Sequence, residues 1–212
     1  SLSGNYDQLN AIAPTITFDP YPTDVTISQY DEMTTTFAII ATALNREDEG
    51  QSVLAHLDET YKKANAALEA AGHGGDSFIL SQGWTYDSVA SFRLFTDNGM
   101  AVQILKQIGL KNAWDAPHHP YGFTEIGIEG FADLKDKDFN FLYVAQEADN
   151  SFFARSPIWG SLTFVKADHA YWLGGDVWLF GGPLSAEVLV QTVLIQMNIP
   201  FIEATPEATA SS

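Results

Sequence analysis

The hydrophobic pattern of the chain changes period at Gly75, and this change constrains the fold more than any other feature. Before it, apolar residues recur every three or four positions over 28–44 and again over 53–68, which is the pattern of two amphipathic helices. Ser28 is a suitable N-cap for the first helix, and the glycines at 72–75 end the second. After Gly75, short apolar runs alternate with short helical patterns, which predicts a layered α/β domain.

Individual elements can be assigned within this pattern. Strands are expected at 77–81, 89–95 and 139–145, with one or two more within 170–180 and a further short strand at 12–18. Helices or helical turns are expected at 99–108, 128–134, 157–162 and 184–197. The sequence shows no internal repeat.

Composition excludes several kinds of function. The 212 residues include no Cys, so thiolate zinc sites, iron–sulfur clusters and Cys nucleophiles are excluded. The formal net charge of −17 argues against nucleic acid and anionic membrane surfaces, because both attract clustered Lys and Arg. The sequence contains none of four common enzyme motifs: the Walker phosphate-binding loop, the dinucleotide-binding Gly-x-Gly-x-x-Gly, the hydrolase Gly-x-Ser-x-Gly and the zinc-protease His-Glu-x-x-His. We therefore expect a binding protein without catalytic residues, metal ligands or a cofactor.

Two short motifs have both a structural and a chemical interpretation. The His118–His119 pair lies between two prolines, and a solvated loop is favoured over a metal site because adjacent residues rarely ligate one ion well. Gly181-Gly182-Pro183 precedes a helix, where a phosphate group can meet a helix N-terminus. A structural turn is favoured there, because no acidic partner for a ribose follows.

The placement of aromatic residues is more informative. Trp178 and Phe180 are two positions apart in an expected strand, so they should point to the same face, with Val177 and Leu179 on the other. Tyr121, in a loop, and Trp84, after the first strand, should lie at the same edge of the sheet. Because open α/β sheets bind ligands at the carboxyl ends of their strands, these four rings form a candidate binding face. Packing in the core is the competing interpretation for each ring.

Several segments together resemble the iron–siderophore substrate-binding proteins of ABC importers, and most closely the ferric hydroxamate (ferrichrome-type) branch. Two segments near the start of the chain also match this family in the expected chain order. They are 6–15, which contains Ile-Ala-Pro-Thr, and the helix that begins at 28. The segments that carry the resemblance are Ile108-Gly-Leu-Lys-Asn-Ala-Trp114, Tyr121-Gly, Ile126-Gly-Ile-Glu-Gly130, Ser156-Pro-Ile-Trp159 and Asp176-Val-Trp-Leu-Phe-Gly-Gly-Pro-Leu-Ser185.

The resemblance implies an architecture of two lobes joined by a rigid helix, with the ligand held between them. On this basis 28–44 is the connecting helix, and 45–203 is a C-terminal, three-layer, Rossmann-like α/β lobe with a mostly parallel central sheet. Residues 1–27 are the end of an N-terminal lobe that is otherwise absent. Independently of the resemblance, the Ala-, Thr-, Pro- and Ser-rich composition of 204–212 predicts a disordered tail. The implied location is the periplasm or, as a lipoprotein, the outer side of the membrane. Self-association through the apolar face of the connecting helix is also expected.

The resemblance also assigns roles to residues. Tyr121, Trp178 and Phe180 fall on cleft aromatics of the family, and Glu129 falls on the acidic residue that docks on the membrane permease. Arg93 and Asn98 lie near the cleft in this interpretation, with ordinary surface roles as the alternative, and Trp84 remains a candidate from its place at the edge of the sheet. The family's hydroxamate-contacting Arg belongs to the first lobe and cannot be assigned here.

The expected ligand is a ferric siderophore and the expected partner is the permease of an ABC transporter. Within the same fold, a haem, cobalamin or catecholate-siderophore receptor is the alternative. From other classes, an α/β enzyme that acts on a phosphate-bearing substrate and an interaction module without a small ligand remain open.

Overall fold

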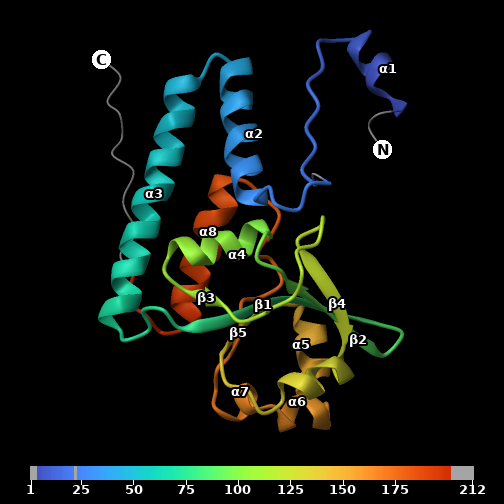
Figure 1. Cartoon of the computed structure of the whole chain (residues 1–212), viewed down its shortest axis with the longest axis vertical. Coiled ribbons are helices and arrows are strands. Elements are labelled where there is room, and N and C mark those ends of the chain that lie inside the picture. The colour runs from blue at the N-terminus through green and yellow to red at the C-terminus, as the bar shows by residue number, and fades with distance from the viewer. Residues whose placement is uncertain (1–3, 22, 202–212) are drawn as a thin grey trace.

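The computed structural model describes residues 4–21 and 23–201, so the expected tail at 204–212 lies outside the described residues. Two long helices, α2 (Gln29–Ala43) and α3 (Glu47–Ala70), form a helical hairpin that extends away from a central sheet (Figure 1). A short helix, α1 (Tyr6–Asn10), precedes them. The strand expected at 12–18 is wrong: these residues form irregular chain that pairs with no strand in the described part of the structure.

Helix α2 begins where the sequence predicts. The hydroxyl oxygen of Ser28 accepts a hydrogen bond from the amide of Tyr30 at 3.2 Å, which caps the helix. Its apolar stripe packs on the core only near this end, through Tyr30 and Met33, whereas Ile40 and Leu44 are exposed. Self-association through this exposed end stays a prediction.

Helix α3 buries most of its predicted stripe. The residues that lie in the core are Leu57, Tyr61, Ala64 and Leu68.

The central sheet contains β1 (Ser77–Tyr86), β2 (Val89–Phe95), β3 (Lys111–Asn112), β4 (Phe123–Gly127), β5 (Asn140–Val144) and β6 (Ala170–Trp172). The strand order is β4-β2-β1-β5-β6, and β3 pairs with the beginning of β1. β1 pairs in parallel with β3 and β5, and β5 with β6, whereas β1–β2 and β2–β4 are antiparallel. β1 runs five residues beyond its predicted end, because Asp87 and Ser88 adopt positive φ angles and form a tight hairpin turn.

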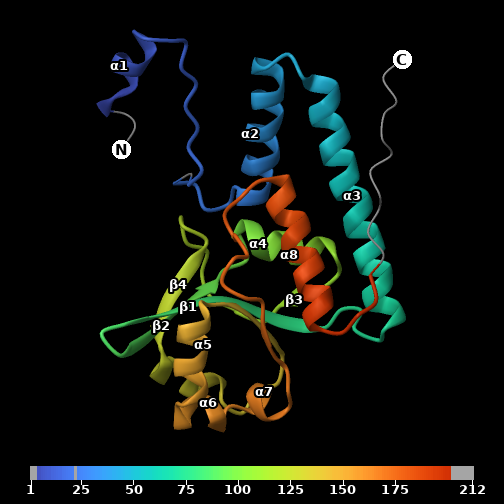
Figure 2. The ribbon, with the colours of Figure 1, turned by 180° about the vertical axis from the view of Figure 1, so that it is seen from behind.

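Helices cover both faces of the sheet and give the three layers (Figures 1 and 2). Helices α3, α4 (Met100–Gln107) and α8 (Pro183–Gln196) pack on one face, around Phe78, Leu80 and Leu142. The other face is covered by η2 (Ile128–Leu134), α5 (Glu147–Ala154), α6 (Pro157–Ser161) and α7 (Thr163–Lys166). The core on that side is rich in rings: Phe92, Phe131, Phe141, Trp159 and Phe164 contact one another edge-on or stacked. The structure thus has the α/β architecture expected from the sequence.

The segment after β6 differs from expectation. One strand forms, Ala170–Trp172, and the chain then leaves the sheet, so Trp178 and Phe180 do not lie on a strand. The amide of Leu173 still donates to the carbonyl of Tyr143 at 2.8 Å, and the carbonyl of Gly174 accepts from the amide of Ala145 at 3.1 Å. Gly174 has φ +88°, and no strand follows it in 175–180. The described part of the chain contains no helix both long and apolar enough to span a bilayer.

Candidate functional site

One end of the sheet's α8-side face is left open. On β1, Phe78 and Leu80 lie fully buried beneath the helices. Gln82 and Trp84 follow with the same alternation and therefore point to the same side, but they are only half-buried. They line a surface pocket of about 280 Å³ at the carboxyl ends of β1 and β5. The sheet thus projects beyond its covering helices and presents side chains to solvent.

Arg93 is fixed at the centre of this open face. The strand register places it between Gln82 of β1 and Glu125 of β4. Its Nη1 donates to Gln82 Oε1 and its Nε donates to Glu125 Oε1, each at 3.1 Å. Its guanidinium carbon lies 5.0 Å from the ring centre of Trp84 and 4.6 Å from that of Phe123, which is cation–π geometry on both sides. Arg93 keeps 33% of its side chain exposed.

Aromatic rings continue outward from Phe123. Its ring centre lies 6.2 Å from that of Tyr121 and 6.3 Å from that of Phe180. Phe180 in turn contacts Trp178 at 5.8 Å, and Tyr121 contacts Tyr21 at 5.2 Å. We call this set the aromatic surface: Tyr21, Trp84, Arg93, Tyr121, Phe123, Trp178 and Phe180. Trp178 and Tyr121 are its most exposed rings, at 60% and 52%.

Trp178 and Phe180 share a side for a reason other than the expected strand. Val177 and Leu179 between and beside them are buried in the core. The buried Val177 and Leu179 alternate with the outward-facing rings of Trp178 and Phe180. An irregular segment therefore shows the same two-residue alternation of buried and exposed side chains as a strand. The structure brings Trp178 and Phe180 together with Tyr121 and Trp84, and their contact with a ligand stays a prediction.

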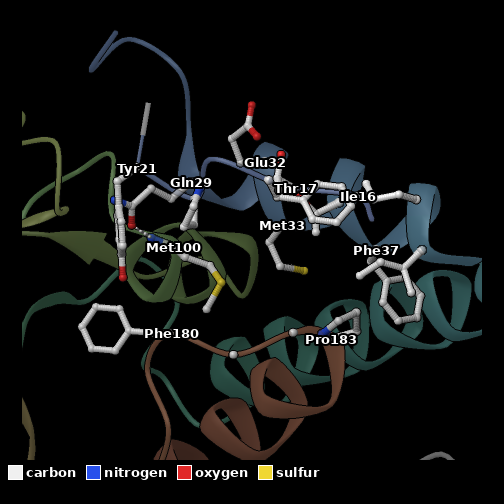
Figure 3. A pocket seen from close by; sticks show the side chains of 16 residues that line it. Ile16, Thr17, Tyr21, Gln29, Glu32, Met33, Phe37, Met100, Phe180 and Pro183 are labelled. Carbon is white, nitrogen blue, oxygen red and sulfur yellow. Dashed lines mark hydrogen bonds between the residues drawn. The ribbon is translucent and has the colours of Figure 1, made fainter. Parts of the chain in front are cut away.

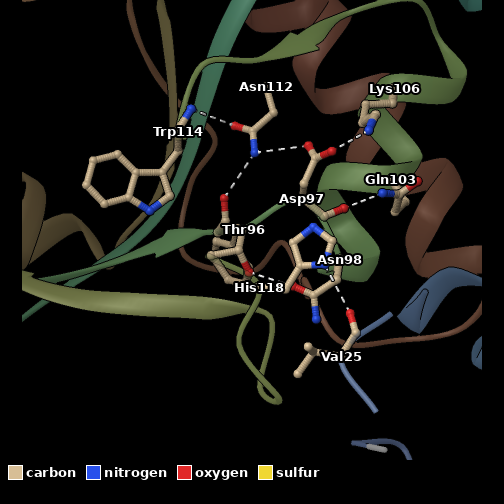
Figure 4. Close-up of polar contacts among 10 residues, drawn as sticks. Val25, Thr96, Asp97, Asn98, Gln103, Lys106, Asn112, Trp114 and His118 are labelled. Carbon is tan, nitrogen blue, oxygen red and sulfur yellow. Dashed lines mark hydrogen bonds and ion pairs between the residues drawn. The ribbon is translucent and has the colours of Figure 1, made fainter. Parts of the chain in front are cut away.

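Asn98 does not belong to the exposed face. It is 4% exposed, and its amide is used within the chain. Oδ1 accepts from the hydroxyl of Thr96 at 2.8 Å (Figure 4). Nδ2 donates to the carbonyl of His119, also at 2.8 Å. The contact of Asn98 with a ligand stays a prediction, whereas the alternative of an ordinary surface role does not fit its burial. The residue holds the loop that carries Tyr121, because a buried amide is stable only when it is hydrogen-bonded.

The Asn-Ala-Trp motif has a similar positioning role (Figure 4). Asn112 accepts from the amide of Trp114 at 3.1 Å and donates to the Asp97 carboxylate at 3.4 Å. Asp97 also binds Lys106 at 2.6 Å, and Trp114 donates from Nε1 to Thr124 Oγ1 at 3.0 Å. The motif therefore fixes the turn between β2 and α4 against β4, beneath the aromatic surface.

The His pair is part of a loop contact. His118 Nδ1 lies 3.0 Å from the carbonyl oxygen of Val25, which ties the loop to the segment before α2. That segment is held by a turn in which the hydroxyl and amide of Thr26 donate to Asp24, and these bonds lower the pKa of the Asp24 carboxyl group. Among the described residues, no cluster of three or more His, Asp or Glu is placed to hold a metal ion.

A larger cavity adjoins the aromatic surface. It measures about 500 Å³ and is lined mainly by apolar side chains from residues 16–21, from α2 and from 180–183 (Figure 3). Tyr21 and Phe180 line the cavity and also belong to the aromatic surface. A bulky ligand on the aromatic surface could therefore also contact the apolar side chains that line this cavity.

Glu129 lies away from this site. It follows the carboxyl end of β4, whereas Tyr121 precedes the amino end of that strand. Its side chain is exposed and lines a separate depression of about 410 Å³ with Arg155 and Ser156. Because Glu129 lies at the other end of β4, a ligand on the aromatic surface would not cover its side chain.

The Gly181–Gly182 turn has the features of a structural turn. Helix α8 begins at Pro183, which has no amide hydrogen to offer an anion. Of the two acidic groups near it in sequence, Asp176 is exposed and Glu187 lies 3.5 Å from His56 of α3. These positions do not assemble a cluster of titratable groups at the turn.

Sequence reasoning missed part of the site. Phe123 and Glu125 alternate with Tyr121 along the chain, and this two-residue period would have placed them on the face of Tyr121. Gln82 stands two positions before Trp84 and carried the same signal. No local sequence pattern indicated that Tyr21 belongs to the site, because its contact with Tyr121 joins segments 100 positions apart.

The comparisons with known proteins agree on one family. A family model described as "Periplasmic binding protein" matches residues 2–177. The chain is 28% identical over 193 residues to the Fe(3+)-citrate-binding protein YfmC of Bacillus subtilis, covering 89% of this chain and 56% of that protein. It is 28% identical over 100 residues to the iron(3+)-hydroxamate-binding protein FhuD of Escherichia coli, covering 47% of this chain and 33% of that protein.

A solved structure shows the same fold. Vibrio cholerae FhuD bound to Fe3+–Desferal superposes with a TM-score of 0.77 at 21% identity, over 94% of this chain and 73% of that one. The chain spans about half the length of YfmC, and about a third of Escherichia coli FhuD is covered.

Proposed function

We propose, from the premise that this chain belongs to the periplasmic binding protein family, that it binds a ferric siderophore for delivery to an ABC transporter. The observation that carries the proposal is the aromatic surface: six rings and one guanidinium group gathered around the open end of the sheet, some on strands and some on neighbouring loops. The names of the similar proteins support it, since they describe binding of ferric citrate and ferric hydroxamates. In this proposal residues 28–44 connect two lobes, 45–203 form one lobe and 1–27 belong to the other.

The chemistry of such a ligand suits the surface. A siderophore already fills the coordination positions of its iron, so the protein has to bind the organic rim and needs no metal ligand of its own. Rings such as Trp178 and Tyr121 bury that rim at about 25 cal/mol per Å² of apolar surface. A few polar groups then fix the orientation, and the remaining Arg93 donors are available for chelate oxygens.

Charge favours a neutral chelate. The one cation of the aromatic surface, Arg93, is paired with Glu125, and the whole sequence carries a formal net charge of −17. A strongly anionic chelate would meet no unpaired positive group there and would be repelled by the negative field. We therefore expect a hydroxamate chelate to bind more tightly than ferric citrate.

The test is a titration of the chain with Fe3+–Desferal, ferric citrate and haem, followed by tryptophan fluorescence. Saturable quenching by Fe3+–Desferal is expected, because Trp84 and Trp178 lie on the surface that it would cover. Iron-free Desferal and Trp178→Ala are the controls. Tighter binding of ferric citrate would reject the hydroxamate class, and the absence of saturable quenching by all three compounds would reject siderophore binding.

Glu129 is proposed to dock on the permease. Its exposure and its position at the far end of β4 support a contact that does not disturb the ligand, and a carboxylate suits a cationic socket. Glu129→Ala should leave Fe3+–Desferal affinity unchanged and should lower uptake in cells that depend on this receptor. Unchanged uptake would remove Glu129 from the docking surface. The same proposal places the protein on the outer side of the cytoplasmic membrane, as in its family.

A further inference from the structure

Gln29 is the one buried residue of helix α2, whose residues are all described. It is 8% exposed, and its side-chain amide joins three elements. Nε2 donates to the carbonyl of Pro120 at 3.0 Å. Oε1 accepts from the amide of Met100, the first residue of α4, at 3.3 Å (Figure 3). Its own backbone amide donates to the carbonyl of Asn98 at 3.2 Å. The amino ends of two helices and the loop 117–122 therefore meet at this side chain.

Two glycines make this junction close-packed. Gly122 has φ +73°, and a methyl group there would lie 2.8 Å from Gln29 Oε1 and 2.8 Å from the Cα of Gly99. A methyl group on Gly99 would lie 2.8 Å from the carbonyl oxygen of Gly122. Such separations leave no free space between Gln29, Gly99 and Gly122. If the first turn of α2 shifts, the loop 117–122 therefore has to shift with it.

The loop carries Tyr121 between the two bonded positions. Pro120, on one side of it, is held by Gln29. Gly122, on the other side, donates to the carbonyl of His119 at 2.8 Å and accepts from the amide of Thr96 at 2.9 Å. The direction of the Tyr121 ring is thus set by backbone contacts on both sides, and the contact with Pro120 comes from α2.

We propose that Gln29 is a positioning residue for Tyr121, and that through it helix α2 and the ligand-contacting loop move as one unit. The inference rests on the proposed function, because it assigns Tyr121 to the ligand. A displacement of α2 would then reorient a ring of the aromatic surface through the backbone of the loop.

The first test needs no ligand. Gln29→Met keeps the length of the side chain and removes both amide bonds, and Gln29→Glu removes the donor to Pro120. Gln51→Glu, on the exposed side of α3, is the matched control for the change of charge. Amide hydrogen exchange should accelerate about tenfold or more over 117–123 in both Gln29 variants, as expected for local opening, with the core of α8 unchanged. Unchanged exchange over 117–123 would overturn the proposal.

The second test separates positioning from a general structural role. Affinity for Fe3+–Desferal is measured for Gln29→Met with Tyr121 present and in a Tyr121→Ala background. The substitution should weaken binding about fivefold with Tyr121 and less than about twofold without it, because coupled residues are non-additive. Equal weakening in both backgrounds would overturn the proposal. If no variant binds the probe, the proposed function fails for hydroxamates, while the exchange measurement still decides whether Gln29 positions the loop.

Discussion

Replacing Trp178 by Ala tests the aromatic surface most directly. The indole is 60% exposed and leans edge-on against Phe180. With about 250 Å² for a whole Trp side chain, about 150 Å² is available to solvent, and a ligand on one face would cover about half of that. At about 25 cal/mol per Å² the lost contact is worth about 2 kcal/mol, or roughly a 20- to 30-fold weaker Kd.

The assay is isothermal titration of the variant and the unmodified chain with Fe3+–Desferal. The part of Trp178 that is covered, about 100 Å² of about 250 Å², is worth at most about 2.5 kcal/mol at about 25 cal/mol per Å², so the variant should unfold in urea with a free energy lower by no more than that amount. Ile195→Ala, on the exposed side of α8, is the control for loss of an exposed apolar group and should leave Kd unchanged. An unaltered Kd for Trp178→Ala would show that the ligand does not cover this ring.

Three further substitutions test the core on the other face of the sheet and the loop that carries Tyr121. Phe131→Ala, which removes a fully buried ring that contacts four others, should lower the free energy of unfolding by about 3–5 kcal/mol in urea titrations; a loss below about 1 kcal/mol would contradict the described core. Gly122→Ala should weaken Fe3+–Desferal binding, because the positive φ and the contact with Gly99 force the loop to move; wild-type affinity would mean that the loop absorbs the methyl group. Burial raises the pKa of Tyr143 to about 12, so its neutral form stabilises the fold below the unfolded pKa of about 10, and this stability is lost as the pH rises through 12. Tyr143→Phe should therefore lose less stability between pH 9 and 11 than the unmodified chain, as measured by urea midpoints, and parallel losses would refute this assignment.

Much of the local structure was accessible from the sequence. The periodicity over 28–44 and 53–68 predicted two helices that end within a few residues of α2 and α3. The apolar run 139–145 predicted the buried strand β5. Strand β4 was missed, because its side chains are only partly buried and it is defined by its pairing with β2.

The fate of 170–180 shows where pattern reasoning fails. Alternating apolar and aromatic residues predicted a strand, yet the backbone leaves the sheet after Gly174, and the alternation arises because Val177 and Leu179 are buried in the core. The conclusion that Trp178 and Phe180 share a side was correct, and the strand was wrong. An alternating sequence pattern indicates which side chains are buried. It does not by itself predict a strand, because a strand also needs a neighbouring strand with which to form hydrogen bonds.

What the sequence determined alone is the long helices, the buried strands and a chemistry without Cys, because these depend on local periodicity and residue type. The short helices α1, α5 and α7 were not predicted. Only the tertiary structure decided that Arg93 stands between Trp84 and Phe123, and that Asn98 is buried under the loop of Tyr121. The reason is physical. A residue's own burial tendency is encoded locally, whereas its neighbours are set by strand register and helix docking between segments far apart in the chain.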